Sequence, residues 1–120
     1  DRRILLIEDT PSNLELLREM LTNTHAITLE ATTGEEGLRI LEQEKNIDLV
    51  IADIRLPDMD GFSLIRRIRS VHPLIPVIAQ TAYAFEHDKQ KCLDAGASYF
   101  LAKPFLQEDL IQAIRNSLLP

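Results

Sequence analysis

The chain has 120 residues, of which 45% are hydrophobic and 27% are charged, which is typical of a folded globular domain and excludes a disordered segment. A formal net charge of −6 argues against direct binding to nucleic acid, and a single cysteine, Cys92, excludes an internal disulfide and suits a reducing compartment. No apolar run reaches the roughly 20 residues that a membrane-spanning helix needs. We therefore expect a cytoplasmic domain without membrane contact of its own, although the parent chain could be membrane-anchored.

One domain over residues 1–120 is the natural expectation for this length. The chain begins with Asp1 rather than methionine and stops just past an apolar, helix-like stretch. We therefore expect it to be a segment of a longer protein.

Apolar periodicity alternates along the chain between strand-like runs and helix-like spacing. Residues 3–7, RILLI, form a nearly continuous apolar run that predicts a short strand. Thr10 followed by Pro11 predicts the start of a helix, because proline suits the first helical turn. Residues 26–31, AITLEA, alternate between apolar and polar side chains, which is typical of a strand at a sheet edge.

The middle of the chain continues the same alternation. A second helix is expected from Gly34 to near Asn46, with Leu38 and Leu41 on its apolar face. Residues 47–52, IDLVIA, become fully apolar in their later half, as a central parallel strand covered on both faces requires. A third helix is expected after Gly61.

Two further strands and two further helices are expected in the last part of the chain. Residues 76–81, PVIAQT, predict a strand, since proline is tolerated as a strand's first residue. A fourth helix is expected from about Phe85 to near Gly96, and residues 98–102, SYFLA, predict a fifth strand. Apolar residues at helical spacing from Leu106 to Leu118 predict the final helix.

Strict alternation of strands and helices predicts a doubly wound α/β fold, in which five helices cover a five-stranded parallel sheet. Crossover connections between parallel strands are right-handed, and the second strand has the pattern of an edge strand. Together these features favour the strand order 2-1-3-4-5, which is the flavodoxin-like arrangement.

Polar residues follow four of the five expected strands. They are Glu8 and Asp9 after the first strand, Asp53 after the third, Thr81 after the fourth and Lys103 after the fifth. Sheets of this kind bind ligands outside the carboxyl ends of their strands, at the point where the strand order reverses. We therefore expect these side chains to meet at one rim of the sheet.

Three carboxylates at one rim repel one another unless a cation neutralises them. Oxygen-only ligands favour Mg²⁺, with Mn²⁺ as the alternative metal. Asp53 lies at the centre of the group and is the expected nucleophile, because carboxylates can form acyl phosphates. The metal and Lys103 would shield the oxygens of an incoming phosphoryl group, and the Thr81 hydroxyl could hydrogen-bond one of them.

Over essentially its full length the chain resembles a response-regulator receiver domain of two-component signalling. The motifs that carry the resemblance are the pair Glu8-Asp9, DIRLPDMDG with Asp53, QTA with Thr81, and LAKPF with Lys103. The resemblance implies that Glu8, Asp9 and Asp53 bind magnesium together with the backbone carbonyl of Arg55. It also implies that Asp53 takes its phosphoryl group from a phosphohistidine of a histidine kinase or a histidine phosphotransfer domain.

The resemblance has further implications for switching and for the parent protein. It implies a cis Lys103–Pro104 bond, and a switch in which Thr81 moves inward and Phe100 fills the vacated space. The change would reshape the face made by helix four, strand five and helix five, through which a homodimer could form. EDTPSN, TAYAFEHDKQKCLDAGA and LAKPF also resemble receivers of hybrid sensor histidine kinases.

Two bulky side chains are expected to set the lifetime of the phosphorylated state. Arg55 lies two residues past the acceptor, and Tyr83 lies two residues past Thr81. Neither side chain readily orients an attacking water, so we expect slow self-dephosphorylation. The domain would promote its own phosphorylation and dephosphorylation without being a stand-alone turnover enzyme.

Other polar residues near these motifs have simpler explanations. Asp58 and Asp60 are expected to be turn or cap residues, because aspartate bonds nearby backbone N–H groups in such loops. Arg69 is expected on the solvent face of the third helix. Gln80 stands where many relatives carry an apolar residue, and the sequence offers no explanation for it.

Two other classes of function compete with a phosphorylated receiver. One is a receiver-like interaction module that works without phosphorylation, and the complete set of site residues argues against it. The other is an enzyme. A dehalogenase-type phosphatase needs a D-x-D pattern after the first strand, where Glu8-Asp9-Thr10 stands, and a flavin site needs a phosphate-cradling loop where the acidic EDTPSN stands.

Overall fold

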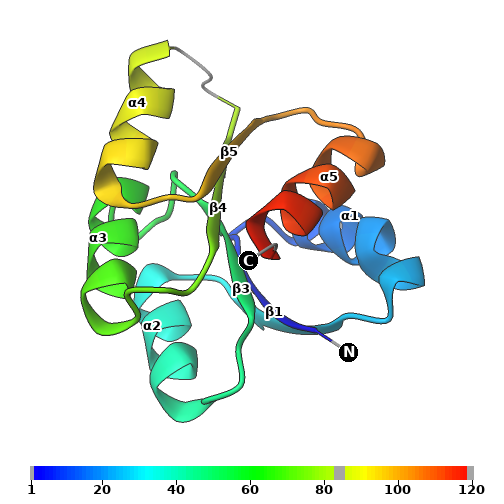
Figure 1. Cartoon of the computed structure of the whole chain (residues 1–120), viewed down its shortest axis with the longest axis horizontal. Coiled ribbons are helices and arrows are strands. Elements are labelled where there is room, and N and C mark those ends of the chain that lie inside the picture. The colour runs from blue at the N-terminus through cyan, green and yellow to red at the C-terminus, as the bar shows by residue number, and fades with distance from the viewer. Residues whose placement is uncertain (1, 83–85, 119–120) are drawn as a thin grey trace.

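The computed structural model describes residues 2–82 and 86–118, which form a parallel sheet between two layers of helices (Figure 1). The strands are β1 (Arg3–Ile7), β2 (Ile27–Ala31), β3 (Leu49–Asp53), β4 (Val77–Thr81) and β5 (Tyr99–Ala102). Their order in the sheet is β2-β1-β3-β4-β5, and every pair of neighbours is parallel. The predicted doubly wound fold and its strand order are confirmed.

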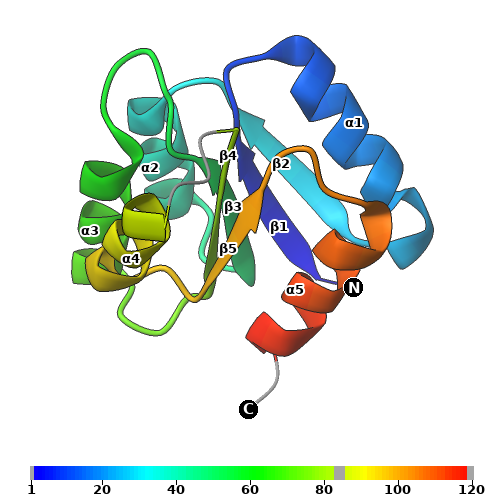
Figure 2. The same cartoon turned by 90° about the horizontal axis from the view of Figure 1, so that it is seen from above.

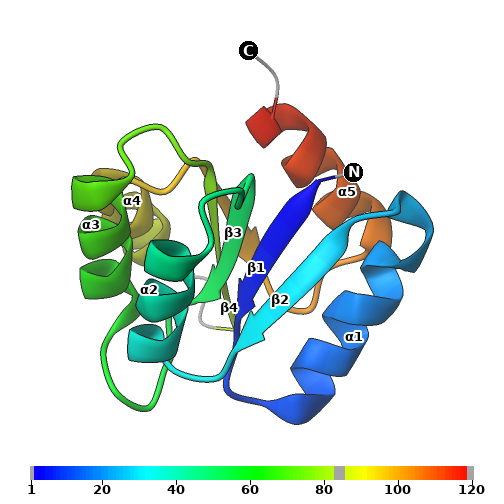
Figure 3. The ribbon, with the colours of Figure 1, turned by 90° about the horizontal axis from the view of Figure 1, so that it is seen from below.

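Helices cover both faces of this sheet (Figures 2 and 3). They are α1 (Pro11–Leu21), α2 (Gly34–Gln43), α3 (Gly61–Val71), α4 (Glu86–Ala95) and α5 (Gln107–Leu118), with a short 3₁₀ turn at Thr22–Thr24. Helices α1 and α5 pack on one face, and α2, α3 and α4 pack on the other. Each face has its own apolar core, so both sides of the central strands are dry.

Burial along the strands follows the predicted pattern. All residues of β3 and β4 are buried, whereas Ile27 of β2 is exposed, as an edge strand allows. Helix α2 ends at Gln43 rather than near Asn46, because Glu44 already has an extended backbone conformation. The expected helical residue Phe85 lies outside the described residues.

Arg69 is the one clear exception to the expected polar surface of α3. Its guanidinium donates hydrogen bonds to the carbonyl oxygens of Gly96 at 2.7 Å, Ile75 at 2.6 Å and Pro73 at 2.9 Å. The expectation of a solvent-facing arginine is therefore wrong. The side chain instead ties the loop after α3 to the turn after α4, where Gly96 has the left-handed φ of 118° that favours glycine.

Candidate functional site

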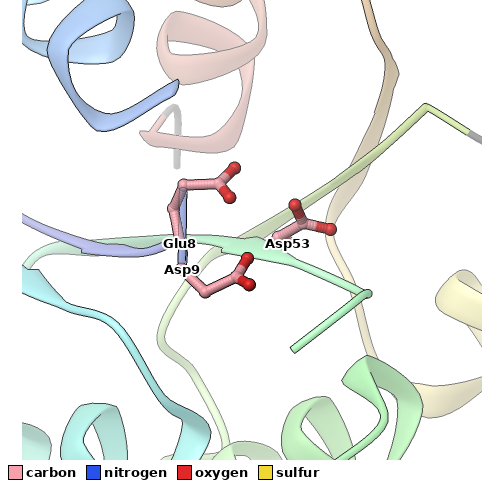
Figure 4. Close-up of side chains that lie close together, drawn as sticks. All are labelled: Glu8, Asp9 and Asp53. Atoms are coloured by element: carbon pink, nitrogen blue, oxygen red, sulfur yellow. The ribbon is translucent and has the colours of Figure 1, made fainter. Parts of the chain in front are cut away.

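Three acidic side chains converge at the carboxyl ends of the central strands. Glu8 and Asp9 follow β1, and Asp53 is the last residue of β3. One oxygen from each carboxylate lies within 4.8 Å of the others. Figure 4 shows the carboxylates of Glu8 and Asp9 turned toward that of Asp53. The predicted meeting of these residues at one rim is confirmed.

The three acids differ strongly in their exposure to solvent. Glu8 is 0% exposed and Asp53 is 6% exposed, whereas Asp9 lies at the surface. Lys103 Nζ donates to Glu8 Oε1 and to Asp53 Oδ2, both at 2.8 Å. The cluster is therefore a buried pair of carboxylates, Glu8 and Asp53, bridged by one ammonium group. The third carboxylate, that of Asp9, lies on the solvent-exposed side.

The orientation of Lys103 depends on the backbone that follows β5. Its amide N–H donates to the carbonyl of Thr81 at 2.7 Å, which continues the strand pairing by one residue. The bond to Pro104 is cis, as the resemblance implied. The lysine side chain reaches the carboxylates from this position with 18% of its surface exposed.

Burial and charge shift the pKa values of Glu8 and Lys103. Desolvation raises the pKa of Glu8, the hydrogen bond from Lys103 opposes that rise, and the nearby charge of Asp53 adds to it. Burial by itself would lower the pKa of Lys103, but the hydrogen bonds to Asp53 and Glu8 outweigh it and the pKa is raised. One ammonium therefore stabilises a cluster that still carries excess negative charge.

This donor set fits a hard divalent cation. Carboxylate oxygens are the ligands that Mg²⁺ prefers, and the exposed Asp9 leaves room for the waters that Mg²⁺ usually retains. Asp53 Oδ1 accepts the backbone N–H of Arg55 at 2.8 Å, which fixes the Asp53 carboxylate against the following loop. A cavity of about 550 Å³ opens beside the cluster, and Asp9, Asp53, Arg55 and Lys103 contribute to its lining.

Thr81 ends β4 at the same edge of the sheet, but its position differs from that of the acids. Neighbouring residues of a strand point to opposite faces, so Thr81 shares the face of Ala79 and is fully buried there. Phe100 pairs with Ala79 in the sheet and packs against the core on that same face. Tyr83 lies outside the described residues.

Gln80 is the site residue that sequence reasoning left unexplained. It pairs with Asp53 across β3 and β4, is 1% exposed, and donates from Nε2 to Glu8 Oε1 at 3.4 Å. Its position in the sequence could have revealed this contact. In the expected sheet, the residue before the last one of β4 lies beside the last residue of β3, which is Asp53.

The other two acids of the DMDG segment cap helices, as predicted. Asp60 precedes α3 and accepts the N–H of Ser63 at 2.9 Å. Asp58 accepts the N–H groups of Gly34 at 2.9 Å and Glu35 at 3.0 Å, at the start of α2. Asp58 therefore fixes the loop after Asp53 to the N-terminal end of α2.

Replacing Asp58 with alanine should lower the free energy of unfolding at pH 7 by about 1 kcal/mol, the usual cost of a lost helix cap. The N–H groups of Glu35 and Gly34 hold the pKa of Asp58 below its ordinary 3.8. Its contribution is therefore present above pH 3.8 and lost as the pH falls through the lowered pKa. Urea unfolding between pH 2.5 and 7 should show wild type and variant converging at the acid end.

The exposed acid Glu42 on α2 provides the control for this measurement. Glu42→Ala should leave the pH dependence close to that of the wild type. A constant gap between wild type and Asp58→Ala across the whole pH range would contradict the capping role.

Comparisons with known proteins agree with this geometry. The family described as response regulator receiver domain matches residues 4–115. The transcriptional regulatory protein GlrR of Escherichia coli K12 is 41% identical over 115 residues, which cover 96% of this chain and 26% of GlrR. The sensor histidine kinase RcsC of the same organism is 35% identical over 114 residues, covering 95% of this chain and 12% of RcsC.

Among solved structures, the receiver domain of sensor histidine kinase PA1611 from Pseudomonas aeruginosa PAO1 matches with a TM-score of 0.89 and 34% identity. The match covers 98% of this chain and 97% of that one, and the PA1611 structure has a magnesium ion coordinated in its active site cleft. Among the described residues, no helix has the length and apolar character needed to cross a membrane. The chain belongs to the response regulator receiver domains of two-component signalling.

Proposed function

We propose that this domain is a phosphorylatable switch in which Asp53 accepts a phosphoryl group from a phosphohistidine of a histidine kinase or histidine phosphotransfer domain. The observation that carries the proposal is the set of groups that surround the Asp53 carboxylate. It is held between Lys103 Nζ and the Arg55 N–H, lies beside Glu8 and Asp9, and faces a cavity open to a partner. A carboxylate that served only to begin a turn would need the Arg55 N–H, but not Lys103, the two other acids or the cavity.

In the proposed reaction, an Asp53 carboxylate oxygen forms a bond to phosphorus as the phosphorus–nitrogen bond of phosphohistidine breaks. The bonding electron pair returns to the imidazole nitrogen of the donor. Lys103 already touches Asp53 Oδ2, so a short movement places its ammonium against a phosphoryl oxygen. The Thr81 hydroxyl would hydrogen-bond another phosphoryl oxygen.

Glu8, Asp9, Asp53 and the backbone carbonyl of Arg55 would hold the metal. When bound there, Mg²⁺ supplies the positive charge that offsets the charge of the phosphoryl oxygens. Mn²⁺ has the same preference for oxygen ligands and is expected to substitute for it. The long side chain of Arg55, together with Tyr83, is proposed to slow attack by water on the acyl phosphate.

Phosphorylation is tested by incubating the domain with phosphoramidate, a small phosphorus–nitrogen donor, in the presence of Mg²⁺ or EDTA. Intact mass spectrometry should find one added phosphoryl group only with Mg²⁺. Borohydride reduction followed by peptide mapping should place it at residue 53. If neither phosphoramidate nor a phosphorylated histidine phosphotransfer domain labels the protein, the phosphorylation-independent interaction module becomes the better explanation.

The proposed output runs through the α3/α4 side of the sheet. Thr81 and Phe100 share that face, so movement of Thr81 toward a phosphoryl group would open space that Phe100 can fill. The ligand shifts this equilibrium only by its differential affinity for the two states. The change would alter the α4-β5-α5 face, which we propose as the surface for a partner or a homodimer.

Phe100→Ala should leave labelling of Asp53 within about twofold of the wild type. It should weaken phosphorylation-dependent dimerisation or partner binding, because no aromatic side chain remains to fill the space that Thr81 vacates. Two-dimensional NMR of wild type, with and without the phosphoryl group, should show shift changes in β5 and α5. Changes confined to β1 and α1 would rule out this route.

The parent protein and its location are also proposals. Both a transcriptional regulator and a sensor histidine kinase contain domains similar to this chain, and the chain spans 26% and 12% of their lengths. We propose that the parent is a hybrid histidine kinase, and the similarity to the RcsC and PA1611 receivers supports this proposal. We propose a cytoplasmic domain, cut from a longer chain, that itself contacts neither nucleic acid nor membrane.

A further inference from the structure

Gln80 occupies a position that the strand register makes special. Leu6, Ile51 and Ile78 lie side by side across β1, β3 and β4, and all three are buried in the core beneath α1 and α5. The next residues on the same face are Glu8, Asp53 and Gln80. A buried row of apolar side chains is thus followed by a row that is entirely polar.

The lengths of these three side chains explain how the outer two meet. Neighbouring strands lie about 4.8 Å apart, so β1 and β4 are separated by about twice that distance. Asp53, in the middle of the row, has a short side chain. Glu8 and Gln80 are each longer by one methylene than their Asp and Asn counterparts, and their head groups approach to 3.4 Å.

The Glu8 carboxylate depends on few donors. Its Oε1 accepts from Lys103 at 2.8 Å and from Gln80 at 3.4 Å, and its Oε2 accepts the N–H of Thr10 at 3.3 Å. Lys103 is shared with Asp53, and phosphorylation of Asp53 as proposed above would draw the ammonium toward the phosphoryl group. Glu8, which is 0% exposed, would then lose its strongest donor.

We propose that Gln80 is a positioning residue that orients the Glu8 carboxylate toward the cation, both before phosphorylation and after Lys103 turns to the phosphoryl group. The amide is neutral, lies on a central strand and has no competing role at Asp53, so it can remain on Oε1 in both states. The distance of 3.4 Å between Gln80 Nε2 and Glu8 Oε1 is long for a hydrogen bond, and Lys103 Nζ contacts the same oxygen at 2.8 Å. This inference rests on the proposed function, because it concerns the metal site of that function.

The test replaces Gln80 with methionine, which has nearly the same shape but no N–H donor. Mutating a residue that hydrogen-bonds a metal ligand typically lowers metal affinity by about 10- to 100-fold. We therefore expect the Mg²⁺ affinity of Gln80→Met, measured by calorimetry or NMR titration, to fall by about tenfold or more. With phosphoramidate as donor, the Mg²⁺ concentration for half-maximal labelling should rise, while the rate at saturating Mg²⁺ stays within about twofold.

A double-mutant cycle with Glu8 separates positioning from a general effect on packing. If Gln80 acts through Glu8, Glu8→Gln and Glu8→Gln/Gln80→Met should bind Mg²⁺ with equal affinity. Gln43→Met, at an exposed glutamine of α2, is the matched control and should equal wild type. Gln80→Leu is measured in parallel, so that a folding defect in one variant does not decide the result.

The outcomes distinguish this inference from the function on which it rests. If the wild-type domain fails to bind Mg²⁺ at all, the proposed function itself is wrong. If wild type binds Mg²⁺ and both Gln80 variants bind it equally well, only the role of Gln80 is overturned. An equal loss of affinity in the presence and absence of the Glu8 carboxylate would also overturn it, because Gln80 would not be acting through Glu8.

Discussion

Asp53→Asn is expected to abolish phosphoryl uptake while leaving the fold intact. The amide has no anionic oxygen to attack phosphorus, so the acyl phosphate cannot form. Its carbonyl oxygen can still accept the N–H of Arg55, which now binds Asp53 Oδ1 at 2.8 Å. The charge of Asp53 raises the pKa of Glu8, so removing it also relieves repulsion between the two buried groups. Intact mass after incubation with phosphoramidate and Mg²⁺ measures the loss, and thermal unfolding checks the fold.

Asp60→Asn is the matched control, because asparagine caps helices about as well as aspartate. Asp60 lies in the same loop and accepts the N–H of Ser63 from outside the carboxylate cluster. This variant should be phosphorylated like the wild type. Equal labelling of Asp53→Asn and wild type would remove Asp53 from the mechanism.

Lys103→Met is expected to destabilise the metal-free domain strongly at neutral pH. It leaves Glu8 and Asp53 facing each other without the ammonium that now contacts both at 2.8 Å. Breaking a buried ion pair on one side costs about 3–5 kcal/mol, and this is an upper bound here because Lys103 keeps 18% of its surface exposed. Urea unfolding at pH 7 in EDTA measures the loss, with the exposed Lys45→Met as the control.

The same variant should show a distinctive dependence on pH. The pKa of Glu8 is raised in the folded chain above its ordinary 4.5, so the stability due to the bound proton is present at low pH and lost as pH rises through the folded pKa. Removing Lys103 raises that pKa further. The stability of Lys103→Met should therefore recover toward that of wild type as the pH falls from 7 toward the folded pKa of Glu8, which lies above 4.5.

Magnesium should also restore stability to Lys103→Met more than to the wild type, because cation and lysine neutralise the same carboxylates. A cation at about 100 times its dissociation constant adds about 2.7 kcal/mol to a protein that binds it only when folded. Unfolding in Mg²⁺ and in EDTA gives the difference for each protein. A variant as stable as wild type in EDTA at pH 7 would show that Lys103 does not hold the pair together.

Sequence patterns alone were sufficient to predict the architecture of the domain. Apolar runs of five residues alternating with helical spacing predicted the strands and helices, because burial on a sheet and on a helix imposes different periods. The exposed edge strand and right-handed crossovers then led to the observed order. Since the carboxyl ends of parallel strands share one edge, the meeting of Glu8, Asp9, Asp53 and Lys103 also followed from the sequence.

Only the tertiary structure decided how those residues are connected. Their order along the chain did not distinguish the buried Glu8 from the exposed Asp9, or indicate that Lys103 bridges Glu8 to Asp53. These features depend on strand register and on the reach of each side chain across neighbouring strands, which periodicity does not encode.

The same reason explains the residues that were misjudged or only partly understood. Arg69 bonds carbonyls in two loops, and Asp58 caps a helix that begins 24 residues earlier in the chain. Gln80 reaches Glu8 across an intervening strand. Each of these contacts joins segments that are distant in sequence, so its geometry exists only once the sheet and its helices have packed.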